Sequence, residues 1–124
     1  MDDKTVLVIE DDRSLARLTE VMLNGKGIKA YLCLDASQSL EMAKRFNPDL
    51  IILDIHMPRR SGIGVLKKLR QDESTQKTPV IISSILSRNQ SIEQLRNMGA
   101  NDFVPKSAGI NALIDRVMHY LESK

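Results

Sequence analysis

Three carboxylates in this sequence each stand directly after a short apolar run. Glu10 and Asp11 follow the run 6–9, and Asp54 follows the run 50–53. If both runs are parallel strands of one sheet, the carboxylates meet at one edge, where like charges repel each other unless a cation joins them. Carboxylate oxygens are the ligands that hard metal ions prefer. The spacing therefore predicts a site for a hard metal ion and a phosphoryl group.

Strands that alternate with helices must position these carboxylates. Short β-rich runs predict five strands, over residues 5–9, 30–34, 50–53, 79–83 and 102–104. Apolar residues at helical spacing follow each strand, most clearly at Ile110, Leu113, Ile114, Val117 and Leu121. This alternation predicts an α/β fold, a doubly wound parallel sheet with helices on both faces.

Local signals predict how individual helices face the core, begin and end. Leu15, Leu18 and Met22 are expected on the buried face of the first helix. Asp35 is an expected N-cap, and Asn47 is expected where the second helix ends. No repeat, linker or low-complexity segment interrupts these units.

The composition fits one domain with an aliphatic core. A chain of 124 residues can form one core but not two, so we expect one domain over residues 1–124. Only 3% of the residues are aromatic, which argues against a stacking platform for nucleic acid. The net charge of +2 is too small to indicate binding to nucleic acid or to a membrane.

Cysteine usage and the N-terminal sequence predict the cellular location. Cys33 is the only cysteine, so no internal disulfide can form, and its apolar surroundings predict a buried thiol. The chain contains no long apolar segment, so we expect neither a signal peptide nor a membrane span. These features predict a cytoplasmic protein.

In doubly wound sheets, functional groups gather beyond the carboxyl ends of the strands. The residues at those positions here are Glu10, Asp11 and Asp12, then Asp54, Ser84 and Lys106. Taken alone, the acidic run could simply favour a helix N-terminus, and Asp54 could be a solvated loop carboxylate. Their combination with a lysine and a serine favours a chemical site.

Four segments of the sequence resemble the receiver domain of two-component response regulators. They are residues 6–12 (VLVIEDD), 49–58 (DLIILDIHMP, with Gly62 beyond), 79–84 (PVIISS) and 99–106 (GANDFVPK). The resemblance covers nearly the whole chain. It implies a five-stranded parallel sheet in the flavodoxin-like order 2-1-3-4-5, five helices and a single receiver domain. Because the chain ends just after the last helix, we expect no output domain.

The resemblance implies that Asp54 is the phosphoryl acceptor and that Mg²⁺ is the cofactor. Asp11 is then a direct metal ligand, Glu10 a ligand through water, and Asp54 and the backbone carbonyl of His56 supply further oxygens. A carboxylate can attack phosphorus to form an acyl phosphate once the approach of two anions is neutralised. The implied chemistry is self-catalysed phosphotransfer and autodephosphorylation, and the protein is not an enzyme in the usual sense.

The remaining implied roles concern signalling. Lys106 contacts the phosphoryl oxygens as a flexible point charge. Ser84 turns toward the phosphoryl group, and Phe103 fills the space that is vacated. The implied phosphodonor is a histidine kinase or a histidine phosphotransfer protein. A downstream protein is expected on the face formed by the fourth helix, fifth strand and fifth helix.

The sequence departs from the family pattern beside the site. The family usually has proline after the site lysine, with a cis bond between them, whereas Ser107 follows Lys106 here and Pro105 precedes it. We expect the Lys106–Ser107 bond to be trans, because a cis bond before a non-proline residue is costly. Ile85 replaces a small residue and could screen the acceptor. His56 could border the path of attacking water, although an exposed loop side chain is the simpler interpretation.

Two other functions remain open at this point. The first is a metal-dependent phosphohydrolase that uses Asp54 as a transient nucleophile on small-molecule phosphates. The second is a degenerate receiver that is never phosphorylated and acts as a constitutive interaction module. The altered positions Ile85 and Ser107 keep the second alternative open, whereas the complete set of acidic residues and Lys106 argues against it.

Overall fold

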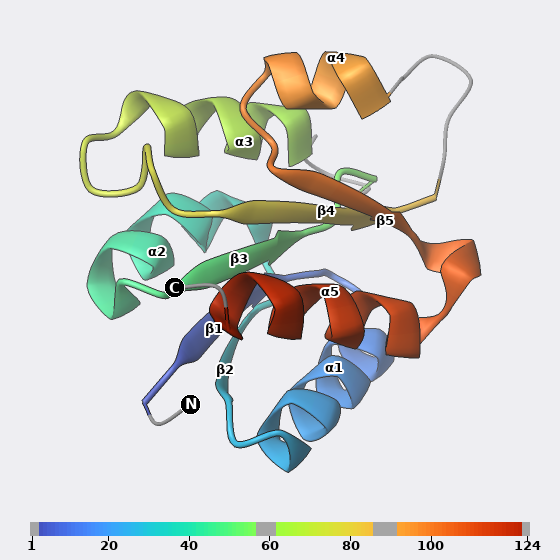
Figure 1. The fold of residues 1–124 in the computed structure, drawn as a ribbon. Helices are drawn as coiled ribbons and strands as arrows, with labels where there is room; N and C mark the ends of the chain where they lie inside the picture. Colours follow the sequence, from blue (N-terminus) through green and yellow to red (C-terminus); the bar gives the residue numbers. More distant parts are fainter. Residues whose placement is uncertain (1–2, 57–61, 86–91, 123–124) are drawn as a thin grey trace.

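Five parallel strands form one sheet, in the order β2-β1-β3-β4-β5 (Figure 1). The computed structural model describes residues 3–56, 62–85 and 92–122. The strands are β1 (Thr5–Ile9), β2 (Lys29–Cys33), β3 (Leu50–Leu53), β4 (Val80–Ser84) and β5 (Asp102–Pro105). The α-helices are α1 (Arg13–Gly25), α2 (Ser39–Phe46), α3 (Gly62–Gln71), α4 (Ile92–Asn97) and α5 (Ile110–Glu122). Two short 3₁₀ helices, η1 (Ala36–Gln38) and η2 (Lys106–Ala108), precede α2 and α5. The predicted doubly wound fold and strand order are confirmed.

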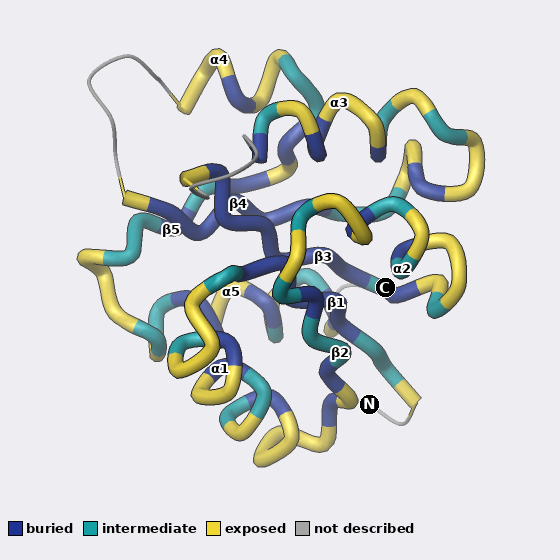
Figure 2. Tube along the Cα trace, turned by 180° about the vertical axis from the view of Figure 1, so that it is seen from behind, coloured by how far each residue is buried: buried dark blue, intermediate teal, exposed yellow. Residues whose placement is uncertain are grey.

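Helices cover both faces of the sheet (Figure 1). Leu7 and Ile9 of β1 belong to the core layer that includes residues of α2, α3 and α4. Val6 and Val8 belong to the layer shared with α1 and α5. Because successive side chains of a strand point to opposite faces, an uninterrupted aliphatic run such as β1 supplies both layers. The strands are buried at the centre, and the exposed residues lie mainly on the helices and loops (Figure 2).

Strand register brings the expected functional residues to one edge of the sheet. Ile9 of β1 pairs with Leu53 of β3, so Glu10 and Asp54, the next residues, emerge side by side. On the other side of β3, Ser84 of β4 pairs with Pro105 of β5, which places Lys106 immediately beyond. β5 is an edge strand, where the missing N–H of Pro105 is tolerated.

Capping residues define several of the helix boundaries. The Asp12 side chain accepts a hydrogen bond from the Leu15 N–H at 3.1 Å and caps α1. Asp35 accepts from the Ser37 N–H at 2.9 Å and caps η1, which leads into α2. Asn47 adopts a left-handed conformation, with φ of 45°, and ends α2 as expected.

Leu18 contradicts the expected buried face of α1. Its side chain is 45% exposed, whereas Ala16, Thr19 and Leu23 are buried. At 3.6 residues per turn, Leu18 lies about 100° around the helix from Thr19 and still farther from Ala16 and Leu23, so it points toward solvent. A buried threonine is tolerated here because the Thr19 hydroxyl donates to the Leu15 carbonyl at 2.8 Å.

Smaller differences concern strand ends, the peptide bond after Lys106 and the cysteine. β2 covers 29–33 rather than 30–34, β4 covers 80–84 rather than 79–83, and β5 extends to Pro105. No peptide bond among the described residues is cis, so Lys106–Ser107 is trans. Cys33 is buried, as predicted. None of the described helices is long and apolar enough to cross a membrane.

Candidate functional site

Asp54 lies at the centre of the candidate site, in the turn after β3, and is 3% exposed. The Ser84 hydroxyl donates to Asp54 Oδ1 at 2.8 Å, and the backbone N–H of His56 donates to the same oxygen at 2.9 Å. The Lys106 ammonium donates to Asp54 Oδ2 at 3.0 Å. Both oxygens of a buried carboxylate are therefore satisfied by groups from three segments of the chain.

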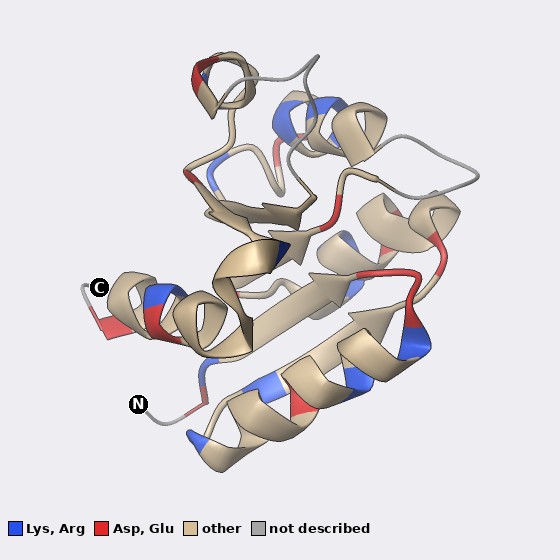
Figure 3. Cartoon of the chain, turned by 90° about the vertical axis from the view of Figure 1, so that its right-hand side faces the viewer, with Lys and Arg blue, Asp and Glu red and all other residues tan. Residues whose placement is uncertain are grey.

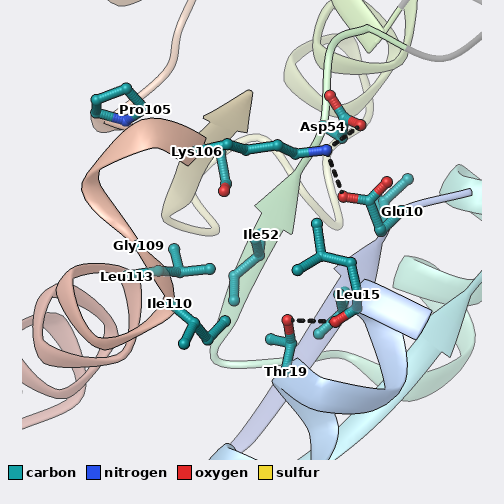
Figure 4. A pocket seen from close by; sticks show the side chains of 13 residues that line it. Glu10, Leu15, Thr19, Ile52, Asp54, Pro105, Lys106, Gly109, Ile110 and Leu113 are labelled. Carbon is teal, nitrogen blue, oxygen red and sulfur yellow. Dashed lines mark hydrogen bonds and ion pairs between the residues drawn. The ribbon is translucent and has the colours of Figure 1, made fainter. Parts of the chain in front are cut away.

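Lys106 also joins Asp54 to the second buried carboxylate (Figure 4). Its Nζ lies 3.0 Å from Glu10 Oε1 as well as 3.0 Å from Asp54 Oδ2. The other oxygen of Glu10 accepts from the Asp12 N–H at 3.2 Å. When both carboxylates are ionised, a single ammonium thus faces two anions at this end of the sheet, and the trio carries a net negative charge.

The pKa values show how unequal the two carboxylates are. Burial alone would raise the pKa of Asp54, but the bonds from His56 N–H, Ser84 and Lys106 outweigh it and bring the pKa below its usual value. Burial raises the pKa of Glu10 to about 7, because Lys106 and the Asp12 N–H only partly offset it and the charge on Asp54 adds to it. At neutral pH Asp54 is therefore ionised to a greater extent than Glu10.

Lys106 remains charged in this setting. Burial by itself would lower its pKa, but the bonds with Glu10 and Asp54 are stronger and raise the pKa above its ordinary value. Because lysine is a compact charge on a flexible stem, Lys106 can follow negative charge that is added near Asp54. The two ion pairs with Glu10 and Asp54 were not predicted from the sequence, because a lysine that follows a strand is usually solvated.

An acidic cluster lies beside this ammonium. Oxygens of Glu10, Asp11 and Asp54 all lie within 4.8 Å of one another, which fits the hard oxygen donors that Mg²⁺ requires. In Figure 3 acidic segments, drawn in red, follow the strands at this edge. The structure thus brings together the three carboxylates that the sequence singled out, with Asp12 serving as the cap of α1.

The other expected site residues lie around the rim. Ser84 is fully buried against Asp54, whereas Ile85, the next residue, is 66% exposed. Phe103 is half-buried and packs against the core layer under α2, α3 and α4. The His56 side chain is exposed, in line with the simpler interpretation. Met57 and Pro58 lie outside the described residues.

A small cavity that the sequence did not reveal lies below the Lys106 side chain (Figure 4). Its volume is about 70 Å³, and apolar residues from β3, α1 and α5 line it, including Leu15, Ile52 and Leu113. Gly109 borders the cavity without a side chain. The only sequence signal was the run of small residues 107–109 after Lys106.

Comparison with known sequences and structures gives one consistent result. The family model of the response regulator receiver domain matches residues 6–118. The solved structure of the Francisella response regulator 1452 receiver domain is 35% identical, with a TM-score of 0.84, and the match covers 98% of this chain and 100% of that one.

Two curated relatives differ in length. The transcriptional regulatory protein DltR of Streptococcus agalactiae is 33% identical over 112 residues, which are 90% of this chain and 49% of DltR. The polar-differentiation response regulator DivK of Brucella ovis is 27% identical over 118 residues, which are 95% of this chain and 96% of DivK. The chain therefore spans about half the length of the first relative and nearly all of the second.

Proposed function

The chain belongs to the response regulator receiver domain family, and we propose that Asp54 accepts a phosphoryl group from a phosphohistidine on a kinase or phosphotransfer protein. Receiver domains in general are phosphoacceptors that bind Mg²⁺ in an acidic pocket. One observation carries the assignment to Asp54. Asp54 is the buried carboxylate that Ser84, the His56 N–H and Lys106 all contact.

The proposed transfer moves one phosphoryl group between two nucleophiles. An Asp54 oxygen attacks phosphorus, the new P–O bond forms as the P–N bond to the donor histidine breaks, and the histidine leaves with the electron pair. The low pKa of Asp54 keeps it ionised and able to attack. Lys106 then pairs with the transferred phosphoryl oxygens. Mg²⁺, when bound by Asp11, Glu10, Asp54 and the His56 carbonyl, supplies the positive charge that lets the two anions approach.

Phosphorylation then biases a two-state surface. The Ser84 hydroxyl, already directed at Asp54, exchanges that partner for a phosphoryl oxygen. Phe103 follows into the space that is left, and the face made by α4, β5 and α5 changes its shape for a downstream protein. Residues 1–124 act as one receiver domain in the cytoplasm under this proposal.

Two rim residues tune the rates of transfer and hydrolysis. Ile85, 66% exposed directly after Ser84, screens the phosphoryl group from water or from a partner. His56, two residues beyond Asp54 and exposed, is kept as a second candidate for this role, although its exposure also fits an ordinary loop side chain.

The test is incubation of the protein with Mg²⁺ and a small phosphodonor, followed by intact mass and by release of inorganic phosphate. The expected result is one phosphoryl adduct per chain, absent from Asp54→Asn. Release of phosphate faster than the adduct decays after donor removal, with little adduct accumulated, instead supports the phosphohydrolase. The absence of any adduct, with phosphohistidine proteins as well as small donors, supports the degenerate interaction module.

A further inference from the structure

A groove runs between α2 and α3, away from the proposed acceptor site. One depression of about 370 Å³ is lined by residues of η1, α2 and α3, among them Ser37, Leu40, Gly64 and Lys68. A second, of about 520 Å³, continues along α2 and is lined by Leu40, Glu41, Lys44 and Arg45. The second depression is lined by α2 alone and meets the first at Leu40. We call the two together the α2–α3 groove. Figure 1 shows the two helices side by side on the same face of the sheet.

The groove has an apolar floor. Leu40 is half-buried and Val65 is buried, and both pack in the core layer below. Gly64, on the exposed side of α3, leaves one wall open, since a Cβ at this position would meet nothing within 4 Å. A floor of this kind can receive the apolar face of a helix.

The groove lies on the most basic pair of helices, and its own lining contains three basic residues, Lys44, Arg45 and Lys68, and one acidic residue, Glu41. Together α2 and α3 carry five basic residues, Lys44, Arg45, Lys67, Lys68 and Arg70, and one acidic residue, Glu41. The resulting charge of +4 exceeds the +2 of the whole chain. By the same count α1 carries +1, α4 carries 0 and α5 carries −1, so the positive charge is concentrated on this pair of helices.

Part of this charge is free to bind a partner. Lys44 pairs with Asp72 at 3.3 Å, and Arg70 is held by the carbonyls of Gly99 and Thr75. Arg45 and Lys68 both line the groove, and neither forms an ion pair within the described residues. The Arg45 guanidinium lies over the Phe46 ring, 5.5 Å from its centroid, a contact that leaves its charge without a carboxylate partner. Cations around an apolar floor complement an apolar surface that carries carboxylates at its margin.

We propose that the α2–α3 groove binds an acidic amphipathic helix of a partner protein. The leucine-like side chains of that helix contact Leu40 and Val65, and its carboxylates contact Arg45 and Lys68. The groove shares no lining residue with the acceptor site and uses no residue of the α4, β5 and α5 face. Binding here is therefore independent of phosphorylation at Asp54, and either proposal can fail alone.

The probe is a fluorescently labelled peptide with leucines at i, i+3, i+4 and i+7 and glutamates elsewhere. Anisotropy should show saturable binding below about 1 mM, and amide resonances of α2 and α3 should shift most. Binding should weaken with added salt. Failure of such peptides to saturate up to that concentration, or shifts centred on other helices, overturns the proposal. So does preferential binding of duplex DNA or anionic vesicles.

Two variants test the groove itself. Gly64→Phe fills it without changing charge, and its control is Gly25→Phe at the end of α1, where a Cβ also meets nothing within 4 Å. The double variant Arg45→Glu and Lys68→Glu reverses the charge at two positions of the groove lining. Its control is Lys26→Glu at the C-cap of α1. Both groove variants should weaken binding about tenfold or more, with the controls unchanged. Equal binding by groove and control variants refutes the proposal, and thermal unfolding confirms that each variant folds.

Discussion

Two partly buried cations are held in contrasting ways. One lies where the strands end, at the carboxyl edge of the sheet, and the other lies where they begin, at the amino edge. At the carboxyl edge, Lys106 bridges the carboxylates of Glu10 and Asp54. At the amino edge, Arg70 donates to the carbonyls of Gly99 and Thr75 at 2.8 and 3.0 Å, and to Asn101 Oδ1 at 3.0 Å. The Lys106 ammonium faces two carboxylates, a pairing that can rearrange when a metal ion binds those carboxylates or when a phosphoryl group offers its oxygens to the ammonium. The charge of Arg70 faces neutral acceptors that only a fixed, planar donor can join.

The difference separates a reactive edge from a structural one. Asn101 Oδ1, one acceptor of Arg70, also accepts from the Val80 N–H at 2.9 Å, so Arg70 ties α3 to the starts of β4 and β5. Gly99 is part of the same arrangement, because a Cβ there would lie 2.7 Å from Arg70 Cγ and its φ is +109°. Variants at the two edges should therefore affect different measurements.

Lys106→Met should produce the largest effect on chemistry. Without its ammonium the transferred phosphoryl group loses a stabilising charge, and we expect phosphorylation to slow by about 100-fold or more. Intact mass against time, with a small phosphodonor and Mg²⁺, measures this rate. A rate close to that of the unmodified protein would show that Lys106 only neutralises Glu10 and Asp54.

Arg70→Met should destabilise the fold and leave the phosphorylation rate unchanged. It leaves part-buried acceptors unpaired, and we expect a loss of about 3 kcal/mol in the free energy of unfolding. Urea unfolding measures the loss, and Arg70→Lys serves as a control that keeps the charge but not the planar donor set. A phosphorylation rate that falls with Arg70→Met would break the division between the two edges.

The pH dependence of stability should reveal Glu10. Its pKa is about 7 in the folded protein against an ordinary 4.5, so its contribution is fully present below pH 4.5 and is lost as pH rises through 7. The loss should reach at most about 3 kcal/mol in the metal-free protein. Asp54, whose pKa is lowered, gives the opposite slope, but only below its ordinary 3.8.

This expectation is tested by urea unfolding between pH 4.5 and 8, with a metal chelator present to keep the protein metal-free. Glu10→Gln should flatten the profile, and Mg²⁺ should restore stability at the alkaline end, where its carboxylate ligands are ionised. A wild-type profile that is already flat would mean that Lys106 neutralises Glu10 completely.

Ile85→Ala should give the smallest effect. Removal of an exposed branched side chain beside Ser84 should speed hydrolysis of the phosphoryl adduct about threefold, or roughly 0.7 kcal/mol in the barrier. Loss of the adduct after donor removal measures this rate, and Ile92→Ala, another exposed apolar side chain, is the matched control. Unchanged rates of both phosphorylation and hydrolysis would remove Ile85 from the site.

Sequence alone predicted the site residues that directly follow the strands. Glu10, Asp54, Ser84 and Lys106 could be placed at one edge because parallel strands bring their carboxyl ends together. Leu18 was wrongly placed on the buried face of α1. Its spacing from Leu15 and Met22 fits one helical face, but only packing against the sheet decides which side of that face is buried.

Features made by two separate elements could not be predicted. The contacts of Arg70 join it to backbone carbonyls near residues 75 and 99, and no side-chain pattern marks a carbonyl acceptor. The α2–α3 groove likewise depends on how closely two helices approach, and Gly64 gives no sign of an open wall in the sequence. The bounds of β2 and β4 differ by one residue from the predicted ones, because the apolar pattern marks a strand more precisely than it marks the strand's ends.

The outer strands β2 and β5 bear on how the protein behaves at high concentration. Exposed strand edges can pair between molecules and start aggregation. β5 has only four residues and ends in Pro105, which offers no N–H, and β2 begins with exposed Lys29. Both outer strands therefore oppose backbone pairing between copies of the chain. Contacts with other proteins are then expected to use side chains on the surface and not strand edges.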